Sequence, residues 1–290
     1  FWAPLNLFAQ AATGHGFTPG ALAAVRWTVV AICLFAFVRV RGVVLPKGRD
    51  ALLVLAMGAL FFGPAHFLFY RALEMTTPVE GVVLGTSAPI WTSLLAWIFL
   101  RERIGGAGWL ALALGASGAY VVSVGFRPPA LDSANSVGNV LYLAAVLFEA
   151  IVGIVIAPVV RRSSGIGTLA YQTLGAGIGL LVAVPFLAPF AVATDATGWG
   201  AAGYMIVFAG LVNFGVWYGL VERNDLSFLA ISLLVQPPLA ALLSWRVRGE
   251  TPSLQTGVGT ALILVALAIS VAASRPRRRG GPTPPATSRT

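Results

Sequence analysis

Apolar runs of about twenty residues, separated by short stretches of glycine, proline and charged residues, cover most of this 290-residue chain. Only 10% of the residues are charged and 58% are hydrophobic, whereas soluble domains contain about 25% charged and about 45–50% apolar residues. So few charges cannot cover a water-facing surface of this size. Because a helix needs about 20 apolar residues to span a bilayer, we predict an all-α integral membrane protein with ten transmembrane helices.

The predicted spans follow the apolar runs and are joined by short connections. They cover residues 1–14, 20–38, 51–73, 78–99, 105–124, 137–159, 167–189, 199–221, 227–246 and 253–273. The tail, 274–290, is rich in proline, glycine and arginine, which predicts a disordered basic segment. Residues 1–14 lack the basic start and the small-residue cleavage site of a signal peptide.

Basic residues are distributed unequally between the two predicted sides of the membrane. With the N-terminus inside, 14 of the 19 Lys and Arg residues face the inside and 4 face the outside, while Arg26 lies within a span. Cytoplasmic loops carry such an excess, so both termini are predicted to be cytoplasmic. The net charge of +9 follows from this excess and needs no nucleic-acid partner. Arginine greatly outnumbers lysine, which indicates a GC-rich bacterial genome. The expected location is the bacterial inner membrane.

The chain matches itself at an offset of 148 residues. The matched pairs are Tyr70/Tyr218, Glu74/Glu222, Pro89/Pro237, Leu94/Leu242, Leu95/Leu243, Trp97/Trp245 and Glu102/Glu250. Seven matches without a gap indicate a duplication, with repeats over 1–124 and 137–273. Five spans per copy force the second copy to insert upside down, an arrangement typical of secondary transporters with a midplane site. The offset places the start of the first helix about 11 residues before Phe1, so we expect the native N-terminus to be missing.

Three segments resemble the EamA repeat of the drug/metabolite transporter superfamily. They are ALAAVRWTVVAICL (21–34), TPVEGVVLGTSAPIWTSLLAWIFLRERI (77–104) and LAISLLVQPPLAALLSWRVRGETPSLQTGVGTALILVALAI (229–269). The pattern extends over essentially the whole chain, with a proline in the fourth helix and a Glu that closes it in both copies. The resemblance implies ten helices, cytoplasmic termini and export of small metabolites, often amino acids. Exporters of aromatic and neutral amino acids are the best analogy, because the candidate cavity is aromatic and largely uncharged.

Polar and aromatic side chains inside spans are costly and indicate a candidate substrate pathway. The candidate pathway residues are Asn6, His66, Tyr70, Pro89, Asn213, Trp217, Tyr218 and Gln236. His66 and Tyr70 share a helix face, as do Asn213 and Trp217, because each pair is four residues apart. Such a lining would stack a planar substrate and bind its amino and carboxyl groups. Hydrogen bonding between packed helices is the alternative interpretation.

Prolines interrupt predicted spans at matched positions of the two copies. Pro89 lies in the fourth span, and Pro237 and Pro238 follow Gln236 in the ninth. Each removes a backbone hydrogen bond, and interrupted helices at matched positions indicate a binding site. Proline kinks of a purely structural kind are the alternative, because they are common in membrane helices.

Three of the charged residues within spans have candidate roles. Glu149 is near the middle of the bilayer, where a carboxyl group can exchange a proton and couple transport to the proton gradient. A packing role is its alternative. Arg26 is expected to pair with a carboxylate or to anchor helix ends, and Glu80 to favour the first turn of its helix.

No P-loop, HExxH, GxSxG, CxxC or GxGxxG pattern occurs in the sequence. The chain has one cysteine, Cys33, and its two histidines, His15 and His66, lie on different elements. We therefore expect no enzyme activity, cofactor or metal. The leading hypothesis is a multi-pass exporter of an amino acid or similar metabolite, working by alternating access in the lipid bilayer, with protons as the candidate coupling ion. Broad-specificity, proton-coupled drug efflux and a membrane-embedded enzyme are the alternatives.

Overall fold

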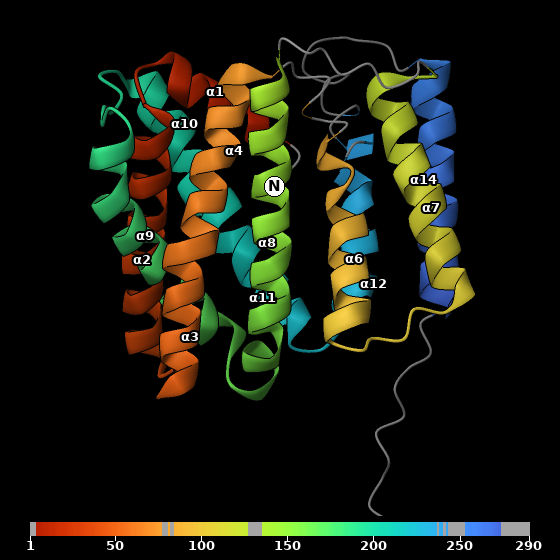
Figure 1. Ribbon diagram of the computed structural model, residues 1–290, viewed down its shortest axis with the longest axis horizontal. Coiled ribbons are helices and arrows are strands. Elements are labelled where there is room, and N and C mark those ends of the chain that lie inside the picture. Colours follow the sequence, from red (N-terminus) through yellow and green to blue (C-terminus); the bar gives the residue numbers. More distant parts are fainter. Residues whose placement is uncertain are drawn as a thin grey trace, which may run out of the picture.

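The computed structural model describes residues 4–76, 81, 84–126, 135–236, 238–239, 242 and 253–273, and every regular element in these ranges is a helix (Figure 1). Six helical segments are long and apolar enough to cross a membrane. They are α2 (Pro19–Arg41), α3 to α4 (Arg49–Met75), α8 (Ser136–Arg162), α9 (Gly165–Leu187), α10 to α11 (Ala196–Val221) and α14 (Leu254–Ala273). The shorter helices are α1 (Leu5–Gly14), α6 (Ala88–Phe99), α7 (Gly106–Val124) and α12 (Leu226–Ser232). The prediction of an all-helical, multi-pass membrane protein is therefore confirmed.

Two of the long segments contain a π-helical turn near their middle, where the chain makes i→i+5 bonds. The first is α3 (Arg49–Met57), η1 (Gly58–Phe62) and α4 (Gly63–Met75). The second is α10 (Ala196–Ile206), η3 (Val207–Val212) and α11 (Asn213–Val221). Such turns occur frequently at functional sites.

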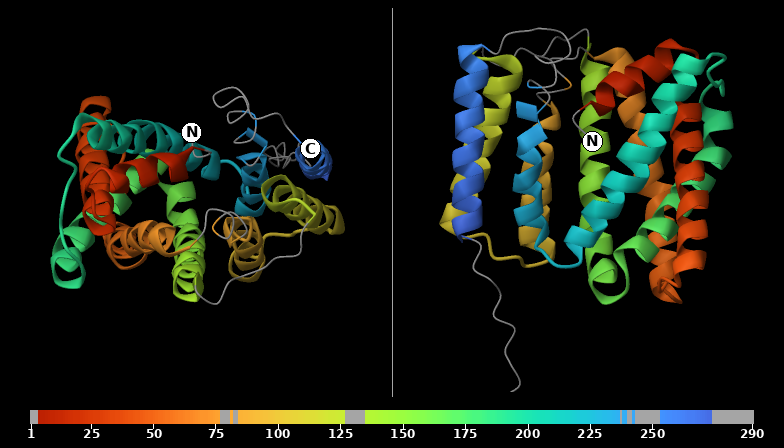
Figure 2. Two further views of the ribbon diagram at one scale, coloured as in Figure 1. Left: turned by 90° about the horizontal axis from the view of Figure 1, so that it is seen from above. Right: turned by 180° about the vertical axis from the view of Figure 1, so that it is seen from behind.

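The helices form two groups (Figures 1 and 2). We call α1 to α4 and α8 to α11 the main group, and α6, α7, α12 and α14 the edge group. The edge group has a core of its own, in which α7 and α14 lie side by side against α12 and η4 (Leu233–Val235). At one end of the molecule, however, Ala96 of α6 and Leu226 and Leu229 of α12 belong to the core of the main group. The two groups are therefore in direct contact at that end.

The connections α2–α3, α6–α7, α8–α9 and α11–α12 lie at this same end, at the bottom of Figure 1, and they and the adjoining helix ends are rich in basic residues, so we call it the basic end. Its members are Arg39, Arg41, Lys47, Arg49, Arg101, Arg103, Arg161, Arg162 and Arg223. Arg162 of α8 is bound there by the carboxylate of Asp50 in α3, with distances of 2.8 and 2.5 Å to its two oxygens. At the opposite end, His15 and Asp195 lie 2.6 Å apart and join α1 to α10.

Gly175 and Gly179 of α9 allow the backbones of neighbouring helices to touch. Their four-residue spacing predicts close helix packing, and the structure confirms it inside the bundle. A Cβ atom at Gly175 would overlap the carbonyl oxygen of Leu55 in α3, and one at Gly179 would lie 2.8 Å from the carbonyl oxygen of Ala59 in η1. No side chain fits between these helices, so glycine is required here for packing.

We expect Gly175→Ala to lower the free energy of unfolding by about 1–3 kcal/mol, because a backbone carbonyl cannot rotate out of the way of a methyl group. The matched control is Gly219→Ala on α11, where no described atom lies within 4 Å of the added Cβ. There the exchange should be neutral or stabilising by up to about 1 kcal/mol. Thermal unfolding of both variants in one detergent measures the difference, and equal melting temperatures would contradict the packing assignment.

Candidate functional site: a cavity between the helix groups

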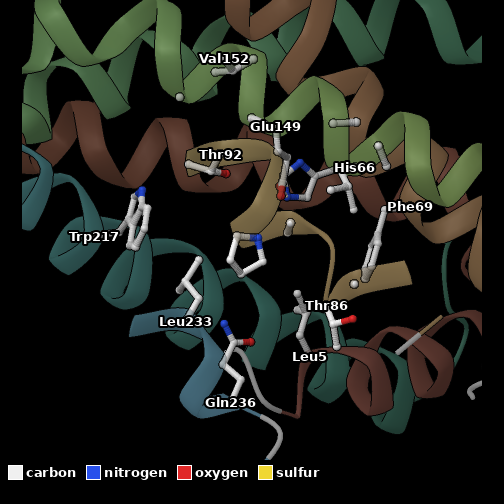
Figure 3. A pocket seen from close by; sticks show the side chains of 18 of the residues that line it. Leu5, His66, Phe69, Thr86, Thr92, Glu149, Val152, Trp217, Leu233 and Gln236 are labelled. Atoms are coloured by element: carbon white, nitrogen blue, oxygen red, sulfur yellow. The ribbon is translucent and has the colours of Figure 1, made fainter. Parts of the chain in front are cut away.

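A cavity of about 620 Å³ lies among helices of both groups (Figure 3). Its wall is formed by α1, α4, α6, α7, α8, α9, α11 and α12, together with η1 and η4. Cavities of this size are typical of small-molecule sites, which combine an apolar wall with a few placed polar groups. Here the wall is largely aromatic and aliphatic, and the polar groups come from amide, hydroxyl, imidazole and carboxyl side chains.

Most of the side chains that the sequence singled out lie on this wall. The lining includes Asn6, His66, Pro89, Glu149, Trp217, Tyr218 and Gln236. Figure 3 shows His66 and Glu149 close together, with Trp217 and Gln236 elsewhere around the same space.

Two predicted pathway residues, Tyr70 and Asn213, are not among the residues that line this cavity. Tyr70 is 1% exposed, and its hydroxyl accepts a hydrogen bond of 2.5 Å from Nη1 of Arg26. Its side chain is therefore packed inside the protein and binds another helix. On α11 the wall is formed by Phe214, Trp217 and Tyr218, at the i, i+3 and i+4 spacing of one helix face.

Sequence reasoning missed several wall residues. They are Leu5, Phe62, Phe69, Thr86, Thr92, Tyr142 and Gln172, among others. Gln172 of α9 is 1% exposed, and neither atom of its amide has a hydrogen-bond partner among the described residues. The signal that could have identified Gln172 is an amide inside an apolar run. Aromatic and aliphatic residues carry no such signal, because in a membrane helix they occur both facing a cavity and facing lipid.

The helix interruption predicted at Pro89 is confirmed, and it lies on the cavity wall. Residues 84–85 are helical, Thr86 and Ser87 form a turn, and α6 then begins at Ala88 with Pro89 in its first turn. In the second half of the chain α12 changes to the 3₁₀ turn η4 directly before Gln236. The prolines and charged residues predicted at Pro237, Glu80 and Glu250, and the tail 274–290, lie outside the described residues.

His66 lies in a cage of aromatic rings between the two halves of the chain. Its ring centre is 4.5 Å from that of Trp27, 4.6 Å from that of Phe62 and 6.3 Å from that of Phe214. Nδ1 lies 3.0 Å from the carbonyl oxygen of Phe62. A carbonyl only accepts hydrogen bonds, so Nδ1 carries the hydrogen and Nε2 of the neutral ring has a free lone pair.

That lone pair faces Glu149, whose Oε1 lies 3.4 Å from Nε2 of His66. Two acceptors repel each other, so this pair forms a hydrogen bond only when one additional proton is present on the carboxyl or on the ring. Glu149 is the only carboxylate among the described lining residues, and 51% of its side chain is accessible within the cavity. The arrangement can therefore take up or release one proton at the cavity wall.

Arg26 is a fully buried cation one layer behind this pair. The expected carboxylate partner is not there: among the described residues, no carboxylate oxygen lies within 4.0 Å of its guanidinium. Nη1 donates to the Tyr70 hydroxyl and the group lies 4.4 Å from the ring centre of Trp27, while Nε and Nη2 have no hydrogen-bond partner among the described residues. Burial of a charge without full compensation is costly, and the Tyr70 hydroxyl and the Trp27 ring compensate the guanidinium of Arg26 only in part.

Comparison with known proteins identifies the family. The chain matches the EamA-like transporter family twice, over residues 1–124 and 136–272. It is 24% identical to the uncharacterized transporter YdfC of Bacillus subtilis, over 88% of this chain and 84% of YdfC. It is also 26% identical to a probable terminal-alkyne amino-acid exporter of Streptantibioticus cattleyicolor, over 93% of this chain and 89% of the exporter. These names indicate a transporter.

A crystal structure of another protein has the same fold. It superposes with a TM-score of 0.78 and 20% sequence identity, over 93% of this chain and 92% of the other. At this level of identity the likeness concerns the arrangement of the helices and carries no information about the substrate.

Proposed function

This chain belongs to the EamA-like transporter family, and from that premise we propose that it is a secondary exporter of small amphipathic metabolites, most of all aromatic and neutral amino acids. The observation that carries the proposal is the cavity, whose wall combines aromatic rings and amides with a single carboxylate among the described lining residues. Export would proceed by alternating access through this cavity.

The proposed architecture is ten spans in two inverted repeats, over residues 1–124 and 137–273. The two separate family matches support it, and so do the two π-helical turns. Shifted back by 148 positions, η3 covers residues 59–64 and overlaps η1 at Gly58–Phe62. Two copies with the same irregularity at the same position are expected after duplication, because a π turn is rare and is not imposed by an apolar sequence.

The cavity wall supports the same proposal. His66 and Phe69 of α4 correspond, at the offset of 148, to Phe214 and Trp217 of α11, and all four line the cavity. The helix interruption at Thr86 likewise corresponds to Leu234 in η4, again on the wall. A cavity built from equivalent positions of two inverted copies is the arrangement that secondary transporters use for a midplane substrate site.

We propose that the basic end faces the cytoplasm of a bacterial inner membrane and that both termini lie on that side. The connections at that end are rich in Lys and Arg, which supports this orientation, because cytoplasmic loops retain basic residues.

The charged groups of an amino acid would find partners among the polar side chains of the cavity wall. The ammonium group would bind the Glu149 carboxylate, and the substrate carboxylate would accept hydrogen bonds from the side-chain amides of Asn6 or Gln236. A planar side chain would stack on Trp217 or Phe69, which gains apolar burial and ring contacts. The relative named as a probable amino-acid exporter lends the substrate class further support.

Flux of radiolabelled amino acids in proteoliposomes tests the proposal. We expect aromatic and neutral amino acids to be transported at least about tenfold faster than acidic ones, because a second substrate carboxylate would remain unpaired beside Glu149. Empty liposomes and vesicles holding the Glu149→Gln variant are the controls. Absence of flux for every amino acid would reject the substrate class.

Broad-specificity, proton-coupled efflux of cationic drugs is the second candidate. The same carboxylate, Glu149, supports it, because a lipophilic cation would bind an aromatic wall that carries one negative group. Flux of lipophilic cations but not of amino acids in the same vesicles would favour this candidate.

A further inference from the structure

Glu102, in the connection between α6 and α7, is a nearly buried carboxylate at the basic end, and its side chain is 5% exposed. It accepts hydrogen bonds from the backbone N–H groups of Leu226 and Ser227, both at 3.0 Å, and from the Ser227 hydroxyl at 2.8 Å. All of these bonds lie within the edge group. These three bonds hold the carboxylate in one position without any contribution from the main group.

Arg161, in the last turn of α8, approaches Glu102 from the main group. Its Nη2 donates to Oε1 of Glu102 at 2.8 Å and to the carbonyl oxygen of Asn224 at 3.3 Å, and Oδ1 of Asp225 lies 3.9 Å away. Burial raises the pKa of the Glu102 carboxyl, but the hydrogen bonds from Ser227, Arg161 and Leu226 lower this pKa by more, so it lies below its usual value. The pair is therefore charged at neutral pH.

This ion pair lies directly beneath the cavity. Leu226, whose N–H is bound by Glu102, lines the cavity and is only 2% exposed. At this level Ala96, Leu226 and Leu229 of the edge group are packed into the core of the main group. Further along α12, Ile231 and Leu234 belong instead to the separate core of the edge group. The base of the cavity is therefore closed where the two groups meet, next to Glu102.

We propose that the Arg161–Glu102 ion pair is a latch that closes the cavity at the basic end, and that it breaks whenever substrate enters or leaves by that end. Glu102 and Arg161 are thus positioning residues for transport and do not contact the substrate. This inference rests on the proposed alternating-access function. The partial exposure of Arg161, 31% of its side chain, allows water to replace Glu102 when the latch opens.

The adjacent Arg162 provides a matched control. It also forms an ion pair at the end of α8, but its partner Asp50 is on α3. Both helices belong to the main group, so this pair does not cross the cavity. Arg161→Gln and Arg162→Gln remove the same charge from neighbouring positions, and only the first should affect closure.

The experiment measures access to the base of the cavity. Leu226→Cys, in a background where the natural cysteine is removed by Cys33→Ala, provides the reporter and leaves the backbone N–H that binds Glu102 unchanged. A membrane-impermeant maleimide is added to either side of sealed vesicles. We expect Arg161→Gln to increase the labelling rate from the basic end at least about fivefold, and Arg161→Lys to restore slow labelling.

Equal labelling rates in Arg161→Gln and Arg162→Gln would overturn the latch. If Arg161→Gln does not fold, Glu102→Gln is measured instead, because it keeps an acceptor for Ser227 but removes the charge that faces Arg161. Unchanged labelling in that variant would also overturn the proposal. The labelling assay contains no substrate, so its result does not depend on which substrate the protein transports. Failure of the separate amino-acid flux experiment would reject the proposed substrate class but not the latch.

Discussion

Replacement of Glu149 by Gln should abolish the response of transport to a pH gradient. For exchange of one proton per substrate at zero membrane potential, a gradient of about one pH unit supports an about tenfold substrate gradient in the native protein. In the variant this ratio should fall to about one, because an amide exchanges no proton. The geometry supports this expectation, since Nε2 of His66 and Oε1 of Glu149 lie 3.4 Å apart and need a proton between them to bond. Substrate accumulation in proteoliposomes, with the potential held at zero, is the measurement.

Glu74→Gln is the control for this prediction. Glu74 is also a carboxylate of the main group, but it pairs with Arg71 at 2.6 Å and is not among the lining residues. It should therefore retain the full response to the gradient. A Glu149→Gln variant that still accumulates substrate against its gradient would reject proton exchange at this residue, and a native protein indifferent to the gradient would indicate facilitated diffusion.

Replacement of Trp217 by Ala should raise the apparent KM for an aromatic amino acid by about 5- to 100-fold, with a smaller effect on the maximal rate. Removal of a stacked ring costs about 1–3 kcal/mol through lost apolar burial and ring contact. Gln236→Ala should raise KM less, by about 5- to 10-fold, because one neutral hydrogen bond contributes about 1 kcal/mol. Concentration series of initial flux measure both constants.

Trp91→Ala controls for the loss of a large aromatic ring from a membrane helix. Trp91 lies on α6, is 38% exposed and does not line the cavity. Its substitution should leave KM unchanged. A normal KM in both Trp217→Ala and Gln236→Ala would reject the assignment of this cavity as the substrate site.

Much of the fold could be predicted from hydrophobicity alone. The predicted spans at 20–38, 137–159 and 253–273 correspond to α2, α8 and α14, because an apolar run of this length is satisfied in a bilayer only as a helix. The π turns were not predicted. The first of them, η1, lies in close backbone contact with α9, where a Cβ at Gly58 would overlap the carbonyl oxygen of Gln172. Periodicity along one chain contains no information about such a contact.

The candidate site was accessible to sequence reasoning wherever a polar group stood in an apolar run. Asn6, His66, Glu149 and Gln236 were found in this way, because burial of a polar group is costly and indicates a cavity or a partner. The same reasoning predicted Tyr70 in the pathway, whereas in the structure its hydroxyl accepts a hydrogen bond from Arg26. A polar side chain can be satisfied by a cavity or by another helix, and sequence spacing does not distinguish the two.

The sequence by itself determined that this chain is a bundle of membrane helices and which few ionisable groups lie inside it, because the bilayer penalises both unsatisfied backbone and buried charge. Only the tertiary structure decided which of those groups meet. His66 and Glu149 are 83 residues apart in the chain, as their numbers show, yet lie side by side on the cavity wall, with Nε2 and Oε1 3.4 Å apart. Arg161 reaches Glu102 from another helix group in the same way. Such contacts depend on how the helices pack against one another, which the apolar pattern of each helix leaves open.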